Sequence, residues 1–268
     1  MVRLLSRFMN SVALHHGLVS QGEISAEIRE IAAEWEGGGR SEFEPRIDYP
    51  PYRSAILRHP KAALHEVNPE GIERWSPCFG DQDVSRLDAD LTIGHSGPPL
   101  GERIIVAGRV IDGRGRPLTG QLIEIWQANA AGRYIHQGDQ HPAPLDPNFT
   151  GQGRCLTGPD GTFRFLTVKP GPYPWRNHYN AWRPAHIHFS VFGRLFSQRL
   201  VTQMYFPGDP LMALDPIAQS VRDPAARDRL IAHYDHDISV SEFATGYRWD
   251  IVLNGGRQTW MENGDDDG

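Results

Sequence analysis

The chain has 268 residues, of which 39% are hydrophobic and 22% are charged. This balance is typical of a globular protein and differs from the apolar-poor composition of disordered chains. The 27 Lys and Arg against 33 Asp and Glu give a formal charge of −6, which argues against a general electrostatic attraction to nucleic acid or anionic lipid. No apolar run approaches the roughly 20 residues needed to cross a bilayer. The two cysteines cannot form a disulfide-stapled scaffold and are compatible with a reducing compartment. We therefore expect a cytoplasmic protein that binds neither nucleic acid nor a membrane.

An amphipathic helix is predicted near the amino terminus, at residues 25–36. Apolar side chains recur there at helical spacing, Ser25 can cap the first turn, and three glycines follow at 37–39. This helix is either a surface appendage or an element that docks on a partner subunit. Trp35 favours docking, because a tryptophan left in water is unfavourable.

From about residue 100 the sequence changes to short apolar runs separated by turn residues, in a chain with 28 Gly and 21 Pro. Strands of this length between Gly and Pro turns predict an antiparallel β-sandwich with long loops and a few short helices. Because helical segments do not alternate with the strands, a doubly wound parallel sheet is not expected. The predicted strands cover residues 104–111, 122–126, 163–165, 185–192, 199–206 and 246–253.

One helix is expected to interrupt the strands after Asp223. Asp223 is a good cap, Pro224 suits the first helical position, and an apolar stripe follows at Leu230, Ile231 and Tyr234. A cluster of His and Asp at 233–237 comes at the end of this segment, and we interpret it as a solvated helix end rather than a metal site.

The most informative segment is the predicted strand that holds His186 and His188. Side chains alternate between the two faces of a strand, so these imidazoles project together while Ile187 and Phe189 point to the core. Two histidines are a partial metal site, and two neutral imidazoles alone do not bind a metal tightly. Further ligands must come from other segments.

Three segments can supply those ligands. Tyr173 lies in a proline-rich loop just upstream, and its stiff backbone is suited to hold a side chain in place. Tyr134 follows the strand at 122–126. His136, Asp139 and His141 form a polar loop that is more easily explained by exposure to solvent.

The choice among these ligands determines the metal. Two histidines and one carboxylate with open positions are typical of ferrous oxygenases. Two histidines and two tyrosinates indicate Fe(III), because a phenol with a pKa of about 10 is held deprotonated at neutral pH only by a strongly Lewis-acidic cation. For zinc, no Cys or carboxylate stands at the usual spacing to complete the site. The pattern of residues alone leaves these alternatives open.

Several segments in the same order resemble the intradiol ring-cleaving dioxygenases, and among these the beta-chain group that acts on protocatechuate. The resemblance runs from about Tyr52 to about Asn263 and implies that residues 46–268 form the catalytic β-sandwich domain, with residues 1–45 as an extension. The segments that carry it are 124–134, 145–149, 171–177 and 182–189.

The resemblance also implies a ligand set and a substrate pocket. The ligands of a non-haem Fe(III) fall on Tyr134, Tyr173, His186 and His188. In this family the residue matched by Tyr173 leaves the metal and takes up a proton as substrate binds, whereas the one matched by Tyr134 remains. Arg183 is expected to stabilise developing negative charge. The residues that match the family's substrate pocket are Tyr52, Trp126, Trp175, Arg183, Gln203 and Ile217.

The implied function is cleavage of protocatechuate (3,4-dihydroxybenzoate) by O2 to 3-carboxy-cis,cis-muconate, a step of the beta-ketoadipate pathway in the catabolism of aromatic compounds. The implied partner is an alpha chain in a hetero-oligomer. One alternative is a dioxygenase for catechol or hydroxyquinol, although relatives of that kind usually have a larger helical amino-terminal region. The other is a metal-free subunit that binds aromatic ligands or scaffolds an assembly.

Overall fold

The structure is a computed structural model that describes residues 83–175, 181–193, 199–221 and 223–253, together with Ala26, Arg257 and Thr259. The helix predicted at 25–36, apart from Ala26, and the pocket residue Tyr52 lie outside the described residues. Among the residues described, no helix is both long and apolar enough to cross a membrane.

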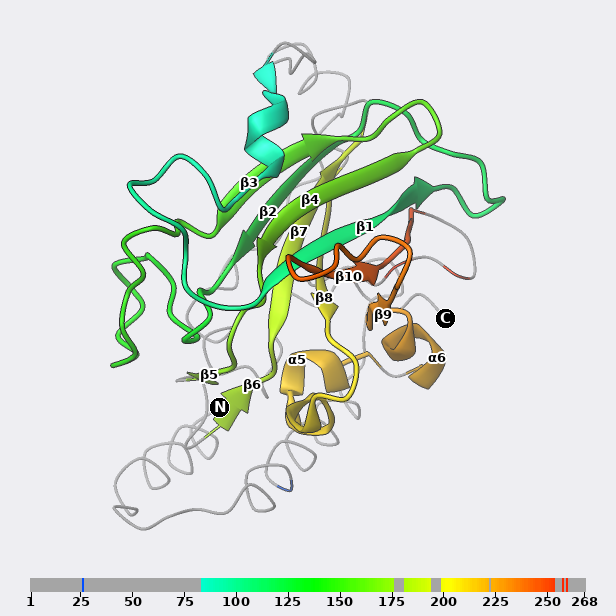
Figure 1. Cartoon of the computed structure of the whole chain (residues 1–268). Helices are drawn as coiled ribbons and strands as arrows, with labels where there is room; N and C mark the ends of the chain where they lie inside the picture. Colours follow the sequence, from blue (N-terminus) through cyan, green and yellow to red (C-terminus); the bar gives the residue numbers. More distant parts are fainter. Residues whose placement is uncertain are drawn as a thin grey trace, which may run out of the picture.

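The strands form two main sheets and one small hairpin (Figure 1). One sheet has the order β11-β1-β10-β9 with β4 beside β1, the other has the order β3-β2-β7-β8, and β5 pairs with β6. Most neighbours are antiparallel, although β1 runs parallel to β10 and β11. The predicted all-β sandwich is confirmed. The strands are β1 (Arg103–Ile111), β2 (Leu122–Gln127), β3 (Gln152–Leu156), β4 (Thr162–Val168), β5 (Tyr173–Trp175), β6 (Ala181–Arg183), β7 (His186–Phe192), β8 (Arg199–Tyr205), β9 (His233–Tyr234), β10 (Thr245–Arg248) and β11 (Ile251–Val252).

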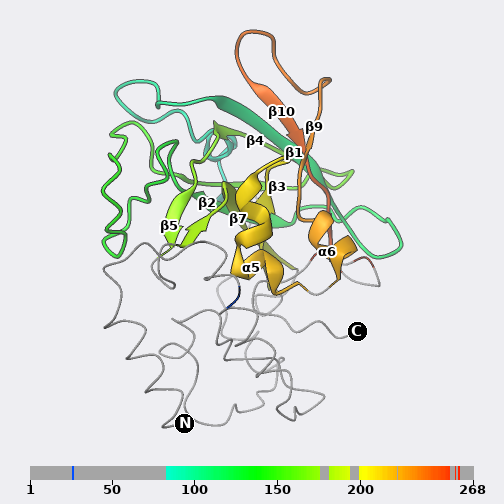
Figure 2. The same ribbon diagram turned by 90° about the horizontal axis from the view of Figure 1, so that it is seen from below.

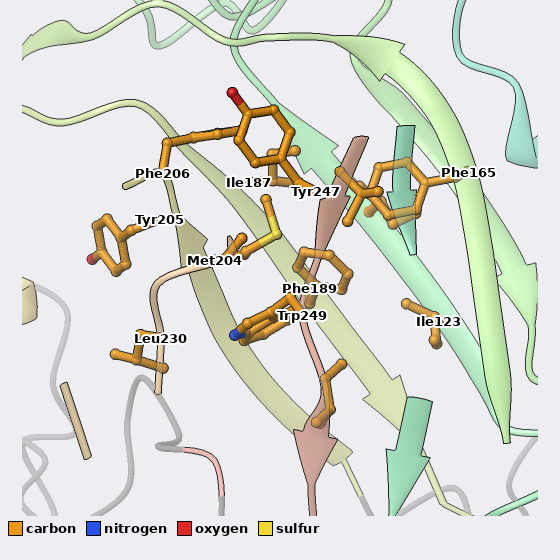
Figure 3. Packing of buried hydrophobic residues seen from close by; sticks show 14 of the residues in the cluster. Ile123, Phe165, Ile187, Phe189, Met204, Tyr205, Phe206, Leu230, Tyr247 and Trp249 are labelled. Carbon is orange, nitrogen blue, oxygen red and sulfur yellow. The ribbon is translucent and has the colours of Figure 1, made fainter. Parts of the chain in front are cut away.

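The two sheets pack over an apolar core to which both contribute aromatic side chains (Figure 3). Phe189 of β7 meets Phe165 of β4 edge to face, with ring centroids 5.8 Å apart. It also meets Trp249, which follows β10, at 4.8 Å. Burying a Phe side chain contributes about 1.5–3 kcal/mol to the stability of the fold. These contacts therefore hold the two sheets together on the core face of β7.

A buried amide ties the sheets together as well. Gln127, the last residue of β2, donates through Nε2 to the Val168 carbonyl oxygen at 2.8 Å, and its Oε1 accepts from the Thr167 hydroxyl at 2.8 Å. Val168 ends β4 in the opposite sheet. The sheets are therefore joined by hydrogen bonds at the point where the chain leaves β2.

Three of the short helices begin at an Asp-Pro pair. Asp209, Asp215 and Asp223 each accept a backbone N–H two residues on, and the proline that follows takes a first-turn position where no N–H is needed. The short helices are η2 (Arg86–Ala89), η3 (Pro210–Leu214), α5 (Pro216–Gln219) and α6 (Pro224–Asp228).

The helix expected after Asp223 is shorter than predicted. α6 ends at Asp228, and Tyr234, which was assigned to its apolar stripe, lies in β9 with 56% of its surface exposed. The cause is a tertiary pairing: the Tyr205 N–H donates to the Leu230 carbonyl, and the Ala232 N–H donates back to Tyr205. These bonds place Ile231 in a bridge with Tyr205 at the end of β8, so the chain leaves the helix there. The His and Asp cluster at 233–237 is therefore not at a helix end.

The β5–β6 hairpin and α5 gather at the end of the sandwich where β7 begins (Figures 1 and 2). η3 packs against β6 there. This end of the molecule brings together most of the side chains that the sequence analysis selected.

Candidate active site

Strand β7 presents its two histidines on the face opposite the core, as predicted. The His186 and His188 rings have centroids 4.8 Å apart. Ile187 and Phe189, which alternate with them along the strand, belong to the core cluster. Both histidines are buried, at 2% and 9% exposed surface. Strand alternation thus places two imidazoles side by side beneath the loops that cover this face.

Tyr134 reaches His188 from the loop after β2. Its hydroxyl lies 3.2 Å from His188 Nε2. The loop is folded by the Asn129 side chain, whose Oδ1 accepts the Ala131 and Arg133 N–H groups at 3.0 and 2.9 Å. The Tyr134 N–H is itself held by Asp139 Oδ2 at 2.8 Å. Local polar contacts therefore fix the backbone that carries this phenol.

Tyr173, the first residue of β5, reaches His186 from the other side. Its hydroxyl lies 3.3 Å from His186 Nε2, and its ring meets the Tyr134 ring edge to face at 5.3 Å. The two loops are joined where the Gly171 N–H donates to the Asn129 carbonyl oxygen at 3.0 Å. Two phenol oxygens and two imidazole nitrogens therefore converge on one place.

His186 has the protonation pattern that a metal ligand needs. Its Nδ1 lies 2.7 Å from the Pro184 carbonyl oxygen, which can only accept, so Nδ1 carries the proton and Nε2 offers its lone pair. Burial, together with the charge of Arg183, lowers the pKa of His186 well below its ordinary value. The ring is therefore neutral, with Nε2 directed to the group of ligand atoms.

The pKa of the Tyr173 phenol indicates which kind of metal ion these four side chains could bind. Burial raises the pKa of its phenol above the ordinary value, although the nearby Arg183 guanidinium opposes this. Without a cation the Tyr173 phenol stays protonated at neutral pH, and a strong Lewis acid is needed to replace a phenol proton. Two phenolates and two neutral imidazoles suit a hard trivalent ion better than zinc or calcium. The residues present therefore fit non-haem Fe(III).

Arg183, the last residue of β6, lies against these ligands although it is only 2% exposed. Its Nη1 donates to His186 Nε2 at 3.1 Å and lies 3.5 Å from the Tyr173 hydroxyl. Its Nη2 donates to Gln203 Oε1 at 2.6 Å. A fixed positive charge is thus buried next to the converging oxygen and nitrogen atoms.

Two family models match the sequence. The model described as "Dioxygenase" matches residues 75–255, and the one described as "Protocatechuate 3,4-dioxygenase beta subunit N terminal" matches residues 45–70. The chain belongs to the intradiol dioxygenase family. The predicted family is therefore confirmed, and the chain is an enzyme of the dioxygenase class.

Named relatives of this dioxygenase differ in how much of it they match. The protocatechuate 3,4-dioxygenase beta chain of Burkholderia cepacia is 54% identical over 220 residues, 81% of this chain and 93% of that protein. The alpha chain of the Pseudomonas putida enzyme is 32% identical, over 59% of this chain and 75% of that one. Among solved structures, 3-chlorocatechol 1,2-dioxygenase of Rhodococcus opacus is similar, at 25% identity and a TM-score of 0.48 over 63% of this chain and 65% of that chain.

The predicted pocket residues of this dioxygenase differ in their position and in how deeply they are buried. Trp126 stacks on His188, with ring centroids 4.8 Å apart and planes within 3°. Trp175 is buried in the same hairpin strand as Tyr173. Ile217 lies in α5, 8% exposed and in the core cluster. Tyr52 is outside the described residues, and its predicted role remains a prediction.

The polar loop with His136, Asp139 and His141 was the alternative source of metal ligands, but its side chains make local contacts instead. Asp139 accepts the N–H groups of Tyr134 and His141, so it shapes the Tyr134 loop. His136 accepts the Gly138 N–H in its own turn, and His141 meets Trp182 edge to face. Within the described ranges, no three His, Cys, Asp or Glu side chains gather as a metal site would require. Of the two candidate ligand sets, the geometry therefore favours the one that contains Tyr134 and Tyr173.

Two buried residues at this site were not selected from the sequence. Tyr205 donates its hydroxyl proton to Gln203 Oε1 or Asp215 Oδ2, which lie 2.9 and 3.0 Å away, and Asp215 forms an ion pair with Arg183. The Asp-Pro pair at 215 is a helix-start signal that predicts a cap. No local pattern predicts that this cap also reaches an arginine on strand β6.

Proposed function

We propose that this chain is the iron-bearing, beta-type subunit of an enzyme that cleaves protocatechuate between its two hydroxylated carbons. The observation that carries the proposal is the convergence of two phenol oxygens and two imidazole nitrogens on one place, each phenol within 3.3 Å of an imidazole nitrogen. This is the donor set that the family resemblance assigned to Tyr134, Tyr173, His186 and His188.

These four side chains would hold a non-haem Fe(III), the metal used by the intradiol dioxygenases. A ferric ion held there would supply Lewis-acid chemistry toward the catechol oxygens of the substrate. Tyr173 is suited to exchange with substrate, because its buried phenol favours the protonated form once it is released. Arg183 would stabilise negative charge that develops on the substrate oxygen beside it.

The identity of the substrate follows from the relatives. A beta chain named for protocatechuate is 54% identical to this chain, whereas the hydroxyquinol 1,2-dioxygenase of a Rhizobium strain is 30% identical over 56% of this chain. Gln203 supports a polar ligand, since its fully buried Nε2 has no hydrogen-bond partner in the part of the chain that the structure describes. Tyr52 is our candidate for binding the substrate carboxylate.

An alpha chain is the proposed partner, because the 54% identical relative is named as the beta chain of an enzyme whose alpha chain is also similar to this sequence. The surface near the ligand loops supports a covering partner. Ile135, which adjoins Tyr134, is 55% exposed, Leu145 is 52% exposed, and Trp182, which adjoins Arg183, is 38% exposed. Apolar side chains of this size at the edge of a buried site are typical of an interface. We retain a cytoplasmic location, and residues 46–268 as the catalytic domain, as predictions.

The visible spectrum of the iron-loaded protein, with and without protocatechuate, tests the metal and the substrate together. We expect a broad tyrosinate-to-iron absorption band that shifts when protocatechuate is added without oxygen. On admission of O2 the product should be 3-carboxy-cis,cis-muconate, with catechol and hydroxyquinol turned over more slowly. A colourless protein at full iron loading would overturn the ligand set. Faster turnover of catechol or hydroxyquinol would replace the proposed substrate, and iron content near zero after reconstitution would favour the metal-free scaffold.

Expression with and without an alpha chain tests the partner. We expect the paired chains to elute as a larger species with higher specific activity. A fully active lone monomer would contradict the need for the alpha chain.

A further inference from the structure

Asp215 is a fully buried carboxylate in the chain segment between η3 and α5. It is 0% exposed and follows Leu214, the last residue of η3. A carboxylate removed from water in this way is strongly unfavourable unless it is paired and hydrogen-bonded. The groups that pair with the Asp215 carboxylate therefore indicate its role.

The first partner is Arg183, which Asp215 holds through two parallel hydrogen bonds. Arg183 Nη2 donates to Oδ2 at 2.7 Å, and Nε donates to Oδ1 at 3.1 Å. A two-point contact fixes the plane of the guanidinium as well as its position. Burial alone opposes the charge of Arg183, but the Asp215 carboxylate holds the pKa of this arginine well above its ordinary value.

With one edge of the guanidinium bound to Asp215, its remaining edge faces the ligand atoms. Nη1 is the nitrogen that lies 3.1 Å from His186 Nε2 and 3.5 Å from the Tyr173 hydroxyl. Tyr205 supports the arrangement, since its hydroxyl lies 3.0 Å from both Arg183 Nη2 and Asp215 Oδ2. Arg183 therefore has one orientation, and its Nη1 is aimed at the ligand atoms.

The second partner is the backbone of Ile217. Its N–H donates to Asp215 Oδ1 at 3.3 Å, which caps the first turn of α5. The same carboxylate thus holds Arg183 on β6 and the start of the helix that carries Ile217, a predicted pocket residue. The two elements are joined through one side chain.

We propose that Asp215 is a positioning residue for ring cleavage, one that orients Arg183 toward the Tyr173 and His186 ligand atoms and joins Arg183 to α5. This inference rests on the proposed function. Arg183 stabilises developing charge only if its nitrogen atoms are already in place when the charge appears. Asp215 provides that placement without contacting the ligand atoms itself.

A double-mutant cycle with Asp215→Asn, Arg183→Met and the combined variant tests the inference. In the iron-loaded protein, with its alpha chain if that is required, we expect Asp215→Asn to lower kcat about 100-fold. The KM for protocatechuate should change by less than about threefold, because substrate binding retains its other contacts. The combined variant should be no slower than Arg183→Met alone, because residues that act as one unit are not additive.

Melting of the metal-free chain gives a readout that does not depend on turnover. Asp215→Asn leaves a buried guanidinium without its counter-charge and should lower the melting temperature. Adding Arg183→Met should recover part of that loss, since the uncompensated charge is gone. Asp88→Asn is the matched control: Asp88 also pairs with an arginine, Arg154 at 2.7 Å, but both side chains are partly exposed. It should leave kcat unchanged.

Three results would overturn the inference alone, in an enzyme that cleaves protocatechuate. The first is a kcat for Asp215→Asn within about threefold of the parent. The second is a combined variant in which the Asp215→Asn loss appears again in full on top of Arg183→Met. If Asp215→Asn does not fold, Tyr205→Phe replaces it as the test variant. We expect it to lower kcat three- to tenfold while the iron absorption band stays unchanged. An unchanged kcat for Tyr205→Phe is then the third result that would overturn the inference. A parent inactive on every catechol overturns the proposed function, and this inference with it.

Discussion

Gly132 lies directly against the backbone of Pro172: a Cβ built on Gly132 would stand 2.1 Å from the Pro172 carbonyl oxygen. Gly132 also has a φ of +76°, a left-handed conformation that other residues adopt only at a cost. Because Gly132 belongs to the Tyr134 loop and Pro172 precedes Tyr173, this contact allows the two phenols to meet. The approach of the two loops depends on the absence of one side chain.

Gly132→Ala should therefore both destabilise the fold and separate the two tyrosines. A left-handed backbone alone costs an alanine about 1–2 kcal/mol. The contact with Pro172 must add to this, so the free energy of unfolding should fall by more than that amount, and the iron-loaded protein should lose most of its visible absorption. Urea denaturation and the visible spectrum measure the two effects.

Gly115→Ala is the matched control for this variant. Gly115 has a φ of +81°, but a Cβ there meets nothing within 4 Å. It should show the backbone cost of about 1–2 kcal/mol with full iron retention. Equal losses in the two variants would mean that the close contact with Pro172 has no role.

Tyr173→Phe should remove one of the two phenolates, and with it part of the tyrosinate-to-iron band and most of the turnover. The proton balance gives a second readout. Because burial raises the pKa of Tyr173, its phenol is protonated in the metal-free chain at neutral pH, and ferric iron must displace that proton. Iron affinity should therefore rise with pH, and the variant should release about one proton fewer per iron bound than the parent.

A pH indicator in weakly buffered solution measures this release, and Tyr234→Phe is the control. Tyr234 is 56% exposed and pairs with His236 at the surface, so its loss should change neither proton release nor colour. Equal proton release from the parent and Tyr173→Phe would show that Tyr173 is not a ligand.

Gln127→Leu should destabilise the sandwich without touching the ligands. The change leaves the Val168 carbonyl and the Thr167 hydroxyl without the partners they have at 2.8 Å. Each buried polar group left unpaired costs about 1–3 kcal/mol, so for these two groups we expect a loss of about 2–6 kcal/mol in the free energy of unfolding. Urea denaturation measures it. Gln140→Leu, at an exposed glutamine that donates to the Gln137 carbonyl, should change stability by less than about 0.5 kcal/mol. A similar small change for Gln127→Leu would argue against the inter-sheet bond.

The parts of the site that could be predicted from sequence are those with a local pattern. Alternation along one strand was sufficient to place His186 and His188 on one face, and the structure confirms it. The two tyrosines came from separate loops, so residue patterns left the ligand set open and only the resemblance to a family selected Tyr134 and Tyr173. Asp215 was missed because its role depends on an ion pair with Arg183, which lies on strand β6, 32 residues earlier in the chain.

The length of α6 shows the opposite failure, in which a local pattern was overridden. Asp223, Pro224 and the apolar residues beyond them predict a longer helix than the one that forms. The backbone bonds of Tyr205 with Leu230 and Ala232 are made in place of further helical turns. Helix propensity is worth only tenths of a kcal/mol per residue, so pairing with a buried strand end prevails.

Trp126→Ala should weaken the metal centre through His188 without removing a ligand. The Trp126 ring covers the His188 ring in a parallel stack with centroids 4.8 Å apart. Such stacks are worth about 0.5–1.5 kcal/mol beyond the area that they bury. A looser His188 ring should therefore release iron about two- to tenfold faster, as measured by loss of the visible band in the presence of a chelator.

Trp126→Phe keeps an aromatic face, and its rate of iron release should lie between those of the parent and the alanine variant. Tyr234→Ala removes an exposed aromatic ring that meets His236 instead, and its iron should dissociate at the parent rate. If Trp126→Ala also lost iron at the parent rate, the stack would have no part in holding His188.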